Sequence, residues 1–167
     1  SVLHGSKTKA KQLFKLNDSK PTVLVFGGGT GAKAINDLFV EMGKEIEDVA
    51  NVIHITGKGK MPKALSKIGG DYHAVHLLTD EMADVYAATD VIVCRSGMGT
   101  ITEISALKKP SIMIPIPGSD QEANAEAVKH GAIVLDQRDL DAQTLLKKIL
   151  LLLADGEKQK RLSEHIH

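Results

Sequence analysis

Two glycine-bearing joints carry most of the chemistry that this sequence could perform. The first reads FGGGTGAKAIN, from Phe26 to Asn36, and the second reads CRSGMGTITEI, from Cys94 to Ile104. In each joint an apolar run leads through glycines into a stretch of helical spacing. Glycine lets the backbone approach a ligand closely, and the start of a helix presents free N–H groups and a partial positive charge. Both joints therefore predict anion sites, most naturally for phosphate.

The first joint also satisfies the loose dinucleotide fingerprint G-x-G-x-x-G/A through Gly27, Gly29 and Ala32. A dinucleotide site further expects an acidic residue near the end of the second strand, to hold a ribose, but this strand ends HITGKGK. Lys58 could instead face the 2'-phosphate of NADP, so an NADP-dependent oxidoreductase stays open as an alternative. His54 lies inside an apolar run, which favours a packed or loop-bracing residue over a catalytic base.

The second joint carries four polar or reactive side chains. Ser96 is placed as a hydrolase nucleophile would be, but Cys94 stands where the nucleophile elbow needs glycine, which disfavours a serine hydrolase. Cys94 itself is predicted to be a buried thiol, since it lies within an apolar run. Arg95 fits either a phosphate ligand or a side chain turned to solvent. Glu103 is expected in the first turn of a helix, where it could accept two ribose hydroxyls or merely complement the helix dipole, and both readings stay open.

A third polar cluster, PGSDQEANAEAVKHG, follows the fifth apolar run and enters another helix. Gln121 and Asn124 are three residues apart, so they fall on one helical face and could donate amide hydrogen bonds to sugar hydroxyls. Ser119 and Asp120 are ordinary candidates for the N-cap of this helix. The cluster therefore predicts a capped helix whose first turns face a polar ligand.

Six short apolar runs alternate with stretches of helical period, and they predict the elements that position these joints. Strands are expected at residues 22–26, 51–55, 72–77, 91–94, 111–115 and 132–135. Helices are expected at residues 32–42, 62–68, 80–88, 100–107, 121–129 and 140–154. Runs rich in valine and isoleucine with little polar alternation are typical of strands buried on both faces. The sequence thus predicts a doubly wound α/β fold with a parallel six-stranded, Rossmann-like sheet, in which ligands bind beyond the carboxyl ends of the strands.

Composition excludes several classes of protein. The 167 residues fit one domain, and 21 Lys and Arg residues balance 21 Asp and Glu residues, so no overall field recruits nucleic acid. Cys94 is the single cysteine, which fits a reducing, cytosolic compartment, and no apolar run approaches the roughly 20 residues that span a bilayer. His73 and His76 could be read as a pair of metal ligands, but they face opposite sides of the predicted strand and cannot readily bind one ion. No metal site and no cofactor is predicted.

Four motifs follow one another along the chain: FGGGTGA, HITGKG, LLTDEMADVYAATDVIVCRSGMGTITEI and DQEANA. Their order resembles the carboxyl-terminal half of the MurG family, glycosyltransferases of family 28, from about Pro21 to the end of the chain. Members of this bacterial family move N-acetylglucosamine from its UDP donor onto the lipid-linked muramoyl pentapeptide of peptidoglycan synthesis, converting lipid I to lipid II. The resemblance implies an inverting enzyme of the two-domain GT-B fold, whose second domain binds the nucleotide sugar.

The resemblance also implies how the chain is organised. Residues 1–20 would be an interdomain lead-in segment and residues 21–167 the UDP-sugar donor-binding domain. UDP-N-acetylglucosamine would be the ligand, and the lipid-linked muramoyl pentapeptide would meet a preceding acceptor domain, in a protein held peripherally at the cytoplasmic face of the membrane. The chain begins without an initiator methionine, as a piece of a longer protein would. No catalytic base is expected within it, so the chain alone is expected to bind donor without transferring sugar.

Ligand contacts are implied by the same resemblance. Diphosphate contacts are expected at Gly28, Gly29, Thr30 and Ser96, a ribose contact at Glu103, a backbone contact to uracil at Thr79, and sugar contacts at Gln121 and Asn124. The chain departs from the family where Gly29 and Thr30 replace serine and glutamine, and where Ser119 with Asp120 replaces an acidic and basic pair. Another lipid-glycosylating GT-B enzyme and a nucleotide-binding regulatory module remain alternatives beside the oxidoreductase.

Overall fold

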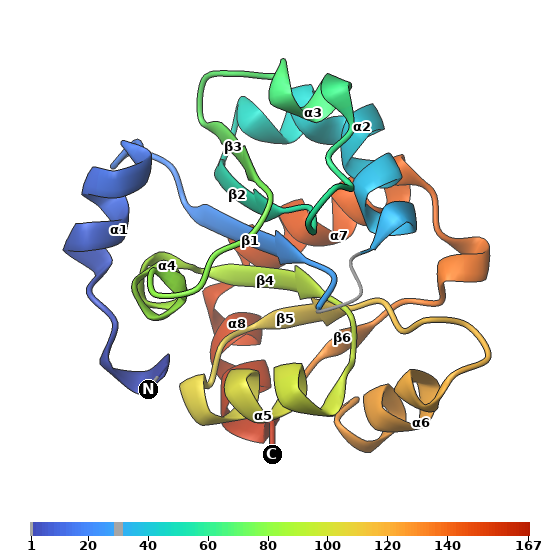
Figure 1. The fold of residues 1–167 in the computed structure, drawn as a ribbon. Coiled ribbons are helices and arrows are strands. Elements are labelled where there is room, and N and C mark those ends of the chain that lie inside the picture. Colours follow the sequence, from blue (N-terminus) through green and yellow to red (C-terminus); the bar gives the residue numbers. More distant parts are fainter. Residues whose placement is uncertain (1, 29–31) are drawn as a thin grey trace.

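A six-stranded parallel sheet forms the centre of the molecule (Figure 1). The computed structural model describes residues 2–28 and 32–167. The strands are β1 (Thr22–Phe26), β2 (Asn51–Ile55), β3 (Tyr72–Val75), β4 (Val91–Cys94), β5 (Ser111–Met113) and β6 (Ile133–Val134), in the spatial order β3-β2-β1-β4-β5-β6. This confirms the predicted doubly wound α/β fold, and the order reverses between β1 and β4, where such folds place a ligand.

Helices connect the strands as the alternating pattern predicts. They are α1 (Lys7–Phe14), α2 (Lys33–Glu47), α3 (Lys63–Ser66), α4 (Met82–Ala88), α5 (Met98–Leu107), α6 (Asp120–Ala127), α7 (Ala142–Ala154) and α8 (Gly156–His165), with short 3-10 turns at Val2–His4 and Gln137–Asp139. Side chains cap several of them: Ser119 accepts from the N–H of Gln121 at the start of α6, and Asp141 accepts from Thr144 at the start of α7. Ser119 is therefore the N-cap that the sequence predicted for α6.

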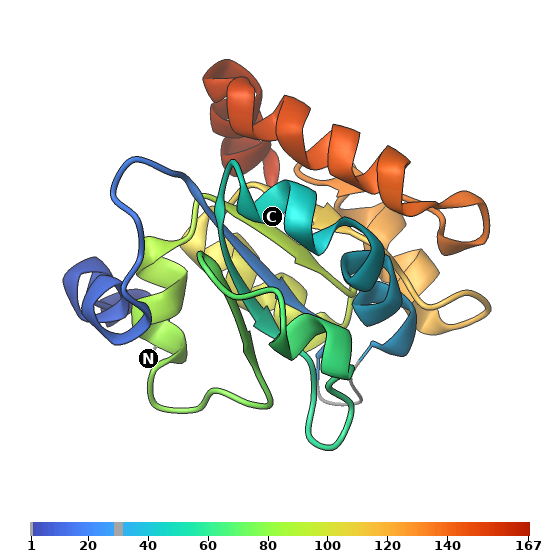
Figure 2. The ribbon, with the colours of Figure 1, turned by 90° about the horizontal axis from the view of Figure 1, so that it is seen from above.

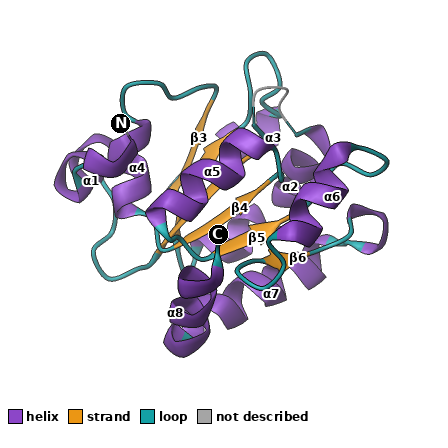
Figure 3. Cartoon of the chain, turned by 90° about the horizontal axis from the view of Figure 1, so that it is seen from below, coloured by secondary structure: helices purple, strands orange, loops and turns teal. Residues whose placement is uncertain are grey.

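The sheet separates two apolar cores, because successive residues of each strand point to opposite faces. Val23 and Val25 of β1 pack with α2 and α7, whereas Leu24 and Phe26 pack with α4 and α5. Figure 2 shows α2 and α7 together over one face of the sheet, and Figure 3 shows α5 lying across the other. Burial on both faces explains why these strands read as continuous apolar runs in the sequence.

The segment before β1 packs on the domain instead of extending from it. α1 lies against α4, and the N–H of Ser6 donates to Oδ1 of Asp84 at 2.7 Å. Ala10, Phe14 and Leu16 are buried in the core on the α4 side. Assignment of residues 1–20 as an interdomain lead-in stays a prediction. None of the helices in the described residues has the length and apolarity to cross a membrane.

Candidate functional site

The register of the sheet brings the two glycine-bearing joints side by side. Phe26 at the end of β1 pairs with Cys94 at the end of β4, so Gly28 and Ser96 both lie two residues beyond a paired position. Gly28 is exposed and has φ +80°, a left-handed conformation that favours glycine. Gly29 and Thr30, which were predicted to contact diphosphate, lie outside the described residues.

Ser96 ties the second joint to α6. Its hydroxyl donates to the backbone oxygen of Gln121 at 2.7 Å, and Nδ2 of Asn124 donates to the backbone oxygen of Ser96 at 3.1 Å. The structure therefore joins three residues that the sequence predicted from two separate motifs. Because Ser96 is fully buried and its hydroxyl proton is committed to Gln121, this hydroxyl is not left to meet an anion.

The amides of Gln121 and Asn124 are each only half used by the protein. Oε1 of Gln121 accepts from the backbone N–H of Ile116 at 3.2 Å, while its amide nitrogen has no hydrogen bond within the described part of the chain. The amide oxygen of Asn124 is likewise without a partner among those residues. Both side chains are partly exposed. The amide nitrogen of Gln121 and the amide oxygen of Asn124 are therefore left for a polar ligand beside α6.

Glu103 does not lie in the first turn of its helix, so that expectation was wrong. α5 begins at Met98, two residues before the predicted start, with Gly97 as an extended N-cap. Gly99 lies inside the first turn of α5, where a helical glycine costs about 0.5–1 kcal/mol relative to alanine. Glu103 is thus the sixth residue of α5, beyond the turn in which a carboxylate complements the helix dipole. The dipole explanation for this residue falls away.

Tyr86 holds the Glu103 carboxylate. The Tyr86 hydroxyl lies 2.8 Å from Oε2 of Glu103 and donates to it, whereas Oε1 has no partner among the described residues. Burial, reinforced by the neighbouring carboxylate, raises the pKa of Tyr86 far above its usual range, so the tyrosine stays protonated as the donor. Sequence reasoning missed this residue. The one available signal was a tyrosine on the buried face of a short helix, since only 2 tyrosines occur in the chain.

Thr79 lies in the exposed turn between β3 and α4. Its N–H donates weakly to Oε2 of Glu81 at 3.4 Å, and its backbone oxygen accepts from the N–H of Met82 at 3.3 Å. No hydrogen bond within residues 2–28 and 32–167 joins Thr79 to the other predicted contacts. The backbone of Thr79 is therefore engaged in its own turn.

Arg95 is buried at the end of β4, so it does not turn to solvent. It is 6% exposed, and Nη1 donates to the backbone oxygens of Ile114 at 2.9 Å and Pro115 at 3.3 Å. Its Nε is buried without a hydrogen bond, and no carboxylate pairs with it in the described part of the chain. Burial lowers the pKa of this guanidinium. Beside it, Cys94 is fully buried, as predicted, and burial raises the pKa of its thiol.

A second polar group lies under the loop that follows β2, and we call it the buried histidine cluster: His54, Asn36 and Tyr72. Nδ1 of His54 lies 2.6 Å from the Tyr72 hydroxyl, and Nε2 lies 2.8 Å from Oδ1 of Asn36. Nδ2 of Asn36 donates to the backbone oxygens of Thr56 at 3.0 Å and Lys60 at 3.3 Å. Burial lowers the pKa of His54 to about 3. His54 is therefore the neutral, loop-bracing residue that its apolar setting predicted.

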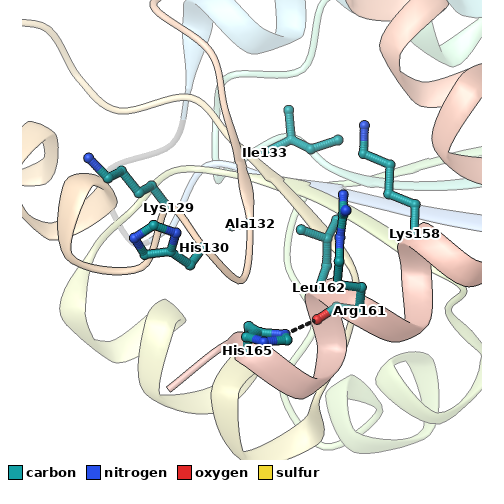
Figure 4. Close-up of a pocket in the computed structure, with 8 residues that line it drawn as sticks. All are labelled: Lys129, His130, Ala132, Ile133, Lys158, Arg161, Leu162 and His165. Carbon is teal, nitrogen blue, oxygen red and sulfur yellow. Dashed lines mark hydrogen bonds between the residues drawn. The ribbon is translucent and has the colours of Figure 1, made fainter.

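A pocket of about 490 Å³ lies beside β6, the last strand in the spatial order of the sheet (Figure 4). It is formed between the residues that precede β6 and helix α8, and its lining is Lys129, His130, Ala132, Ile133, Lys158, Arg161, Leu162 and His165. None of the predicted contacts lines it. Because ligands of doubly wound folds bind at the carboxyl ends of the strands, this pocket is a poor candidate for a nucleotide. No three metal-ligating side chains converge anywhere in the described residues.

We group four polar residues that follow β4 and β5 as one candidate site and call it the edge cluster: Ser96, Gln121 and Asn124, which hydrogen bonds join, and Glu103 on α5. A hollow of about 500 Å³ lies at the carboxyl ends of β1 and β2, between α2 and the loop after β2. Its lining includes Lys33 and Pro62. The free N–H groups at the start of α5 add positive partial charge beside Ser96. These residues offer helix N–H groups for an anion, a carboxylate oxygen that can accept from hydroxyl groups, and amide groups that can donate to or accept from them.

Known proteins match this chain over nearly its whole length. Residues 22–166 match the family described as the glycosyltransferase family 28 C-terminal domain. A relative from Lachnospira eligens is 35% identical over 160 residues, which are 92% of this chain and 45% of the relative. A relative from Clostridium botulinum strain Alaska E43 is 37% identical over 90% of this chain and 44% of its own length. Both are named UDP-N-acetylglucosamine–N-acetylmuramyl-(pentapeptide) pyrophosphoryl-undecaprenol N-acetylglucosamine transferase.

Solved structures include proteins with a similar fold. The crystal structure of MurG from Acinetobacter baumannii superposes with a TM-score of 0.71 and 21% sequence identity, over 99% of this chain and 50% of that one. At this identity the likeness concerns the fold. The chain spans somewhat under half the length of the curated relatives that it matches, 45% in the case of the Lachnospira eligens protein.

Proposed function

The chain belongs to the glycosyltransferase family 28 C-terminal domain family, and we propose that it is the UDP-N-acetylglucosamine-binding part of an inverting glycosyltransferase. The proposed acceptor is a lipid-linked muramoyl pentapeptide, in keeping with the names of relatives that are 35% and 37% identical. The observation that carries the proposal is the match of residues 22–166 to the family, together with an edge cluster that leaves ligand-binding atoms free.

The diphosphate is assigned to the carboxyl ends of β1 and β4, where the two glycine-bearing joints begin. Gly28 presents exposed backbone in the first joint, and the second joint offers the N–H groups of the first turn of α5, to which Ser96 is added through the family resemblance. Gly29 and Thr30 belong to the proposed contact on sequence grounds alone. The Ser96 hydroxyl serves to hold α6, because it donates to Gln121. Helix starts bind phosphate through such N–H groups and the helix dipole.

The nucleoside is assigned to α5 and the turn before α4. Oε1 of Glu103, which has no partner among the described residues, would accept from a ribose hydroxyl, and charge-assisted bonds of this kind are about twice as strong as neutral ones. Uracil is assigned to the backbone at Thr79, whose carbonyl oxygen keeps a second lone pair beyond the bond from Met82. The amide nitrogen of Gln121 and the amide oxygen of Asn124, which have no partners in the described part of the chain, are assigned to the N-acetylglucosamine hydroxyls.

Sugar transfer requires two further things of the enzyme: groups that stabilise the departing UDP, and a base for the acceptor hydroxyl. Charge develops on the departing UDP, and donors fixed before the reaction, at the start of α5, stabilise it without reorganisation. A base must also deprotonate the acceptor hydroxyl from within about 3 Å. Glu103 is committed to the ribose in this scheme, and we assign the base and the acceptor surface to the remaining part of the enzyme. A lipid-linked acceptor places the work at a membrane surface, which agrees with the peripheral cytoplasmic location expected from the sequence.

Calorimetric titration with UDP tests the proposal. The parent chain should bind UDP, and Glu103→Ala should weaken binding by about 1.5 to 3 kcal/mol because the ribose loses a charged acceptor. Glu103→Asp keeps the charge but shortens the reach, so it should fall between the two. Glu164→Ala, which changes an exposed helical glutamate of α8, is the matched control and should bind as the parent does.

Two results would count against the assignment. Equal UDP affinity of the parent and Glu103→Ala would remove Glu103 from the ribose site. Tight binding of NADPH with no binding of UDP would favour the oxidoreductase instead, through Lys58 in the loop after β2.

A further inference from the structure

We propose that Tyr86 is a positioning residue for nucleotide recognition: its hydroxyl fixes the Glu103 carboxylate so that the second oxygen faces the ribose. Tyr86 itself does not touch the ligand in this scheme. The inference rests on the proposed function, because it assumes that Glu103 meets the ribose. It adds a residue that neither the family match nor the sequence motifs single out.

Tyr86 is held more firmly than the glutamate that it contacts. Its side chain is fully buried in the core on the α4 side, and its ring packs edge-on against Phe26 with 6.2 Å between ring centroids. Phe26 is the last residue of β1 and the first residue of the first glycine-bearing joint. Tyr86 therefore stands fixed between α4, the end of β1 and α5, and its hydroxyl has a definite direction.

Glu103, by contrast, is a flexible side chain that is only partly buried. A free glutamate loses rotamer freedom when it binds, at a cost of up to about 2 kcal/mol. The 2.8 Å bond from Tyr86 to Oε2 fixes one oxygen before any ligand arrives. A carboxylate has about four acceptor positions, so one bond from tyrosine leaves Oε1 and part of Oε2 available to two neighbouring hydroxyls. The bond thus orders the acceptor without exhausting it.

A purely structural tie between α4 and α5 predicts a different behaviour. Loss of such a tie would reduce stability and would weaken every ligand of the domain alike. Loss of a positioning residue weakens only those ligands that use Glu103. The ribose hydroxyls therefore separate the two roles, because 2',3'-dideoxy-UDP keeps the uracil and the diphosphate but gives Glu103 nothing to accept.

The experiment is a double-mutant cycle read out with two ligands. Tyr86→Phe keeps the ring and its contact with Phe26 and removes only the hydroxyl. We expect it to weaken UDP about 5-fold, which is about 1 kcal/mol, and to leave 2',3'-dideoxy-UDP unchanged. In the Glu103→Ala background the same substitution should cause no further loss, since the carboxylate that it orients is gone.

Tyr72→Phe is the matched control. It removes the hydroxyl of the other buried tyrosine, which contacts His54 and not the edge cluster. It should lower stability and leave the ratio of the two ligand affinities as in the parent. Thermal unfolding of each variant shows that the protein under titration is folded.

The outcomes separate this inference from the proposed function. Equal weakening of both ligands by Tyr86→Phe, an undiminished effect in the Glu103→Ala background, or unchanged UDP affinity would each overturn the positioning role. If the parent itself binds UDP and 2',3'-dideoxy-UDP equally well, or Glu103→Ala binds UDP normally, the ribose assignment fails and the role of Tyr86 fails with it.

Discussion

The buried histidine cluster and the edge cluster differ in how completely their polar atoms are used. Both combine residues in or just after strands with residues of helices, and a buried tyrosine donates to each. In the buried histidine cluster, both ring nitrogens of His54, both amide atoms of Asn36 and the Tyr72 hydroxyl are engaged. In the edge cluster, an oxygen of Glu103 and half of each amide are free among the described residues.

This difference distinguishes polar groups that stabilise the fold from polar groups that are left available to a ligand. A closed network in a core must satisfy all its members, because each unsatisfied buried group costs about 1–3 kcal/mol. A site that is half open to solvent can keep free donors and acceptors, since water occupies them until a ligand arrives. The two clusters should therefore respond to mutation in opposite ways, the first through folding and the second through affinity.

The largest effect is expected for His54→Ala, which should lower the free energy of unfolding by about 3 kcal/mol or more. The substitution opens a cavity and leaves Asn36 and Tyr72 with unpaired buried atoms. Urea denaturation measures it. His76→Ala, at an exposed histidine just beyond β3, is the control and should change stability by less than about 0.5 kcal/mol. Equal stability of the two variants would break the contrast between the clusters.

A smaller effect should appear in the pH dependence of stability. His54 has a folded-state pKa of about 3 against an ordinary value of about 6.5, so the unfolded chain binds a proton that the folded chain refuses. Stability from this group is fully present above pH 6.5 and is lost as pH falls toward 3. Between pH 7 and pH 5 the parent should lose about 2 kcal/mol more than His54→Gln, since one pKa unit is about 1.4 kcal/mol. Parallel profiles of the two proteins in urea would contradict a neutral His54.

The smallest effect is expected at the sugar. Gln121→Ala and Asn124→Ala should each weaken UDP-N-acetylglucosamine by about 1 kcal/mol more than UDP, because each removes one hydrogen bond to the hexose. Asn124→Ala should also loosen α6, since it loses the 3.1 Å bond to Ser96. Competition between the two ligands in one titration measures the difference. Equal losses for both ligands would move the amides out of the sugar site.

Local patterns predicted the framework of the fold better than the details of the site. All six strands were found in the expected places, because strands buried on both faces read as apolar runs of distinct length. Helix α8 was not expected: it follows α7 after a single residue, Asp155, and its mostly polar sequence gives little apolar period. The start of α5 also differs from its predicted position, because a glycine near the start of a helix is equally compatible with a loop or with the first turn.

Contacts between distant segments could not be read from the sequence. The pairing of Tyr86 with Glu103 depends on how α4 and α5 pack on one face of the sheet. The bond from Ser96 to the backbone of Gln121 depends on where α6 begins in space. The family resemblance named Ser96 and Glu103 as contacts, yet it could not say that the Ser96 hydroxyl is committed within the protein. Their ligand roles stay predictions.

The guanidinium of Arg95, which has no carboxylate partner among the described residues, sets how the proposed diphosphate site should respond to ionic strength. At 0.1 M salt the Debye length is about 10 Å, so the attraction between an anion and exposed lysines such as Lys58 fades as salt is added. A charge inside the protein is screened much less, and Arg95 is 6% exposed beside Ser96. Part of the attraction for a diphosphate should therefore persist in concentrated salt, where a purely surface-charged anion site would release its ligand.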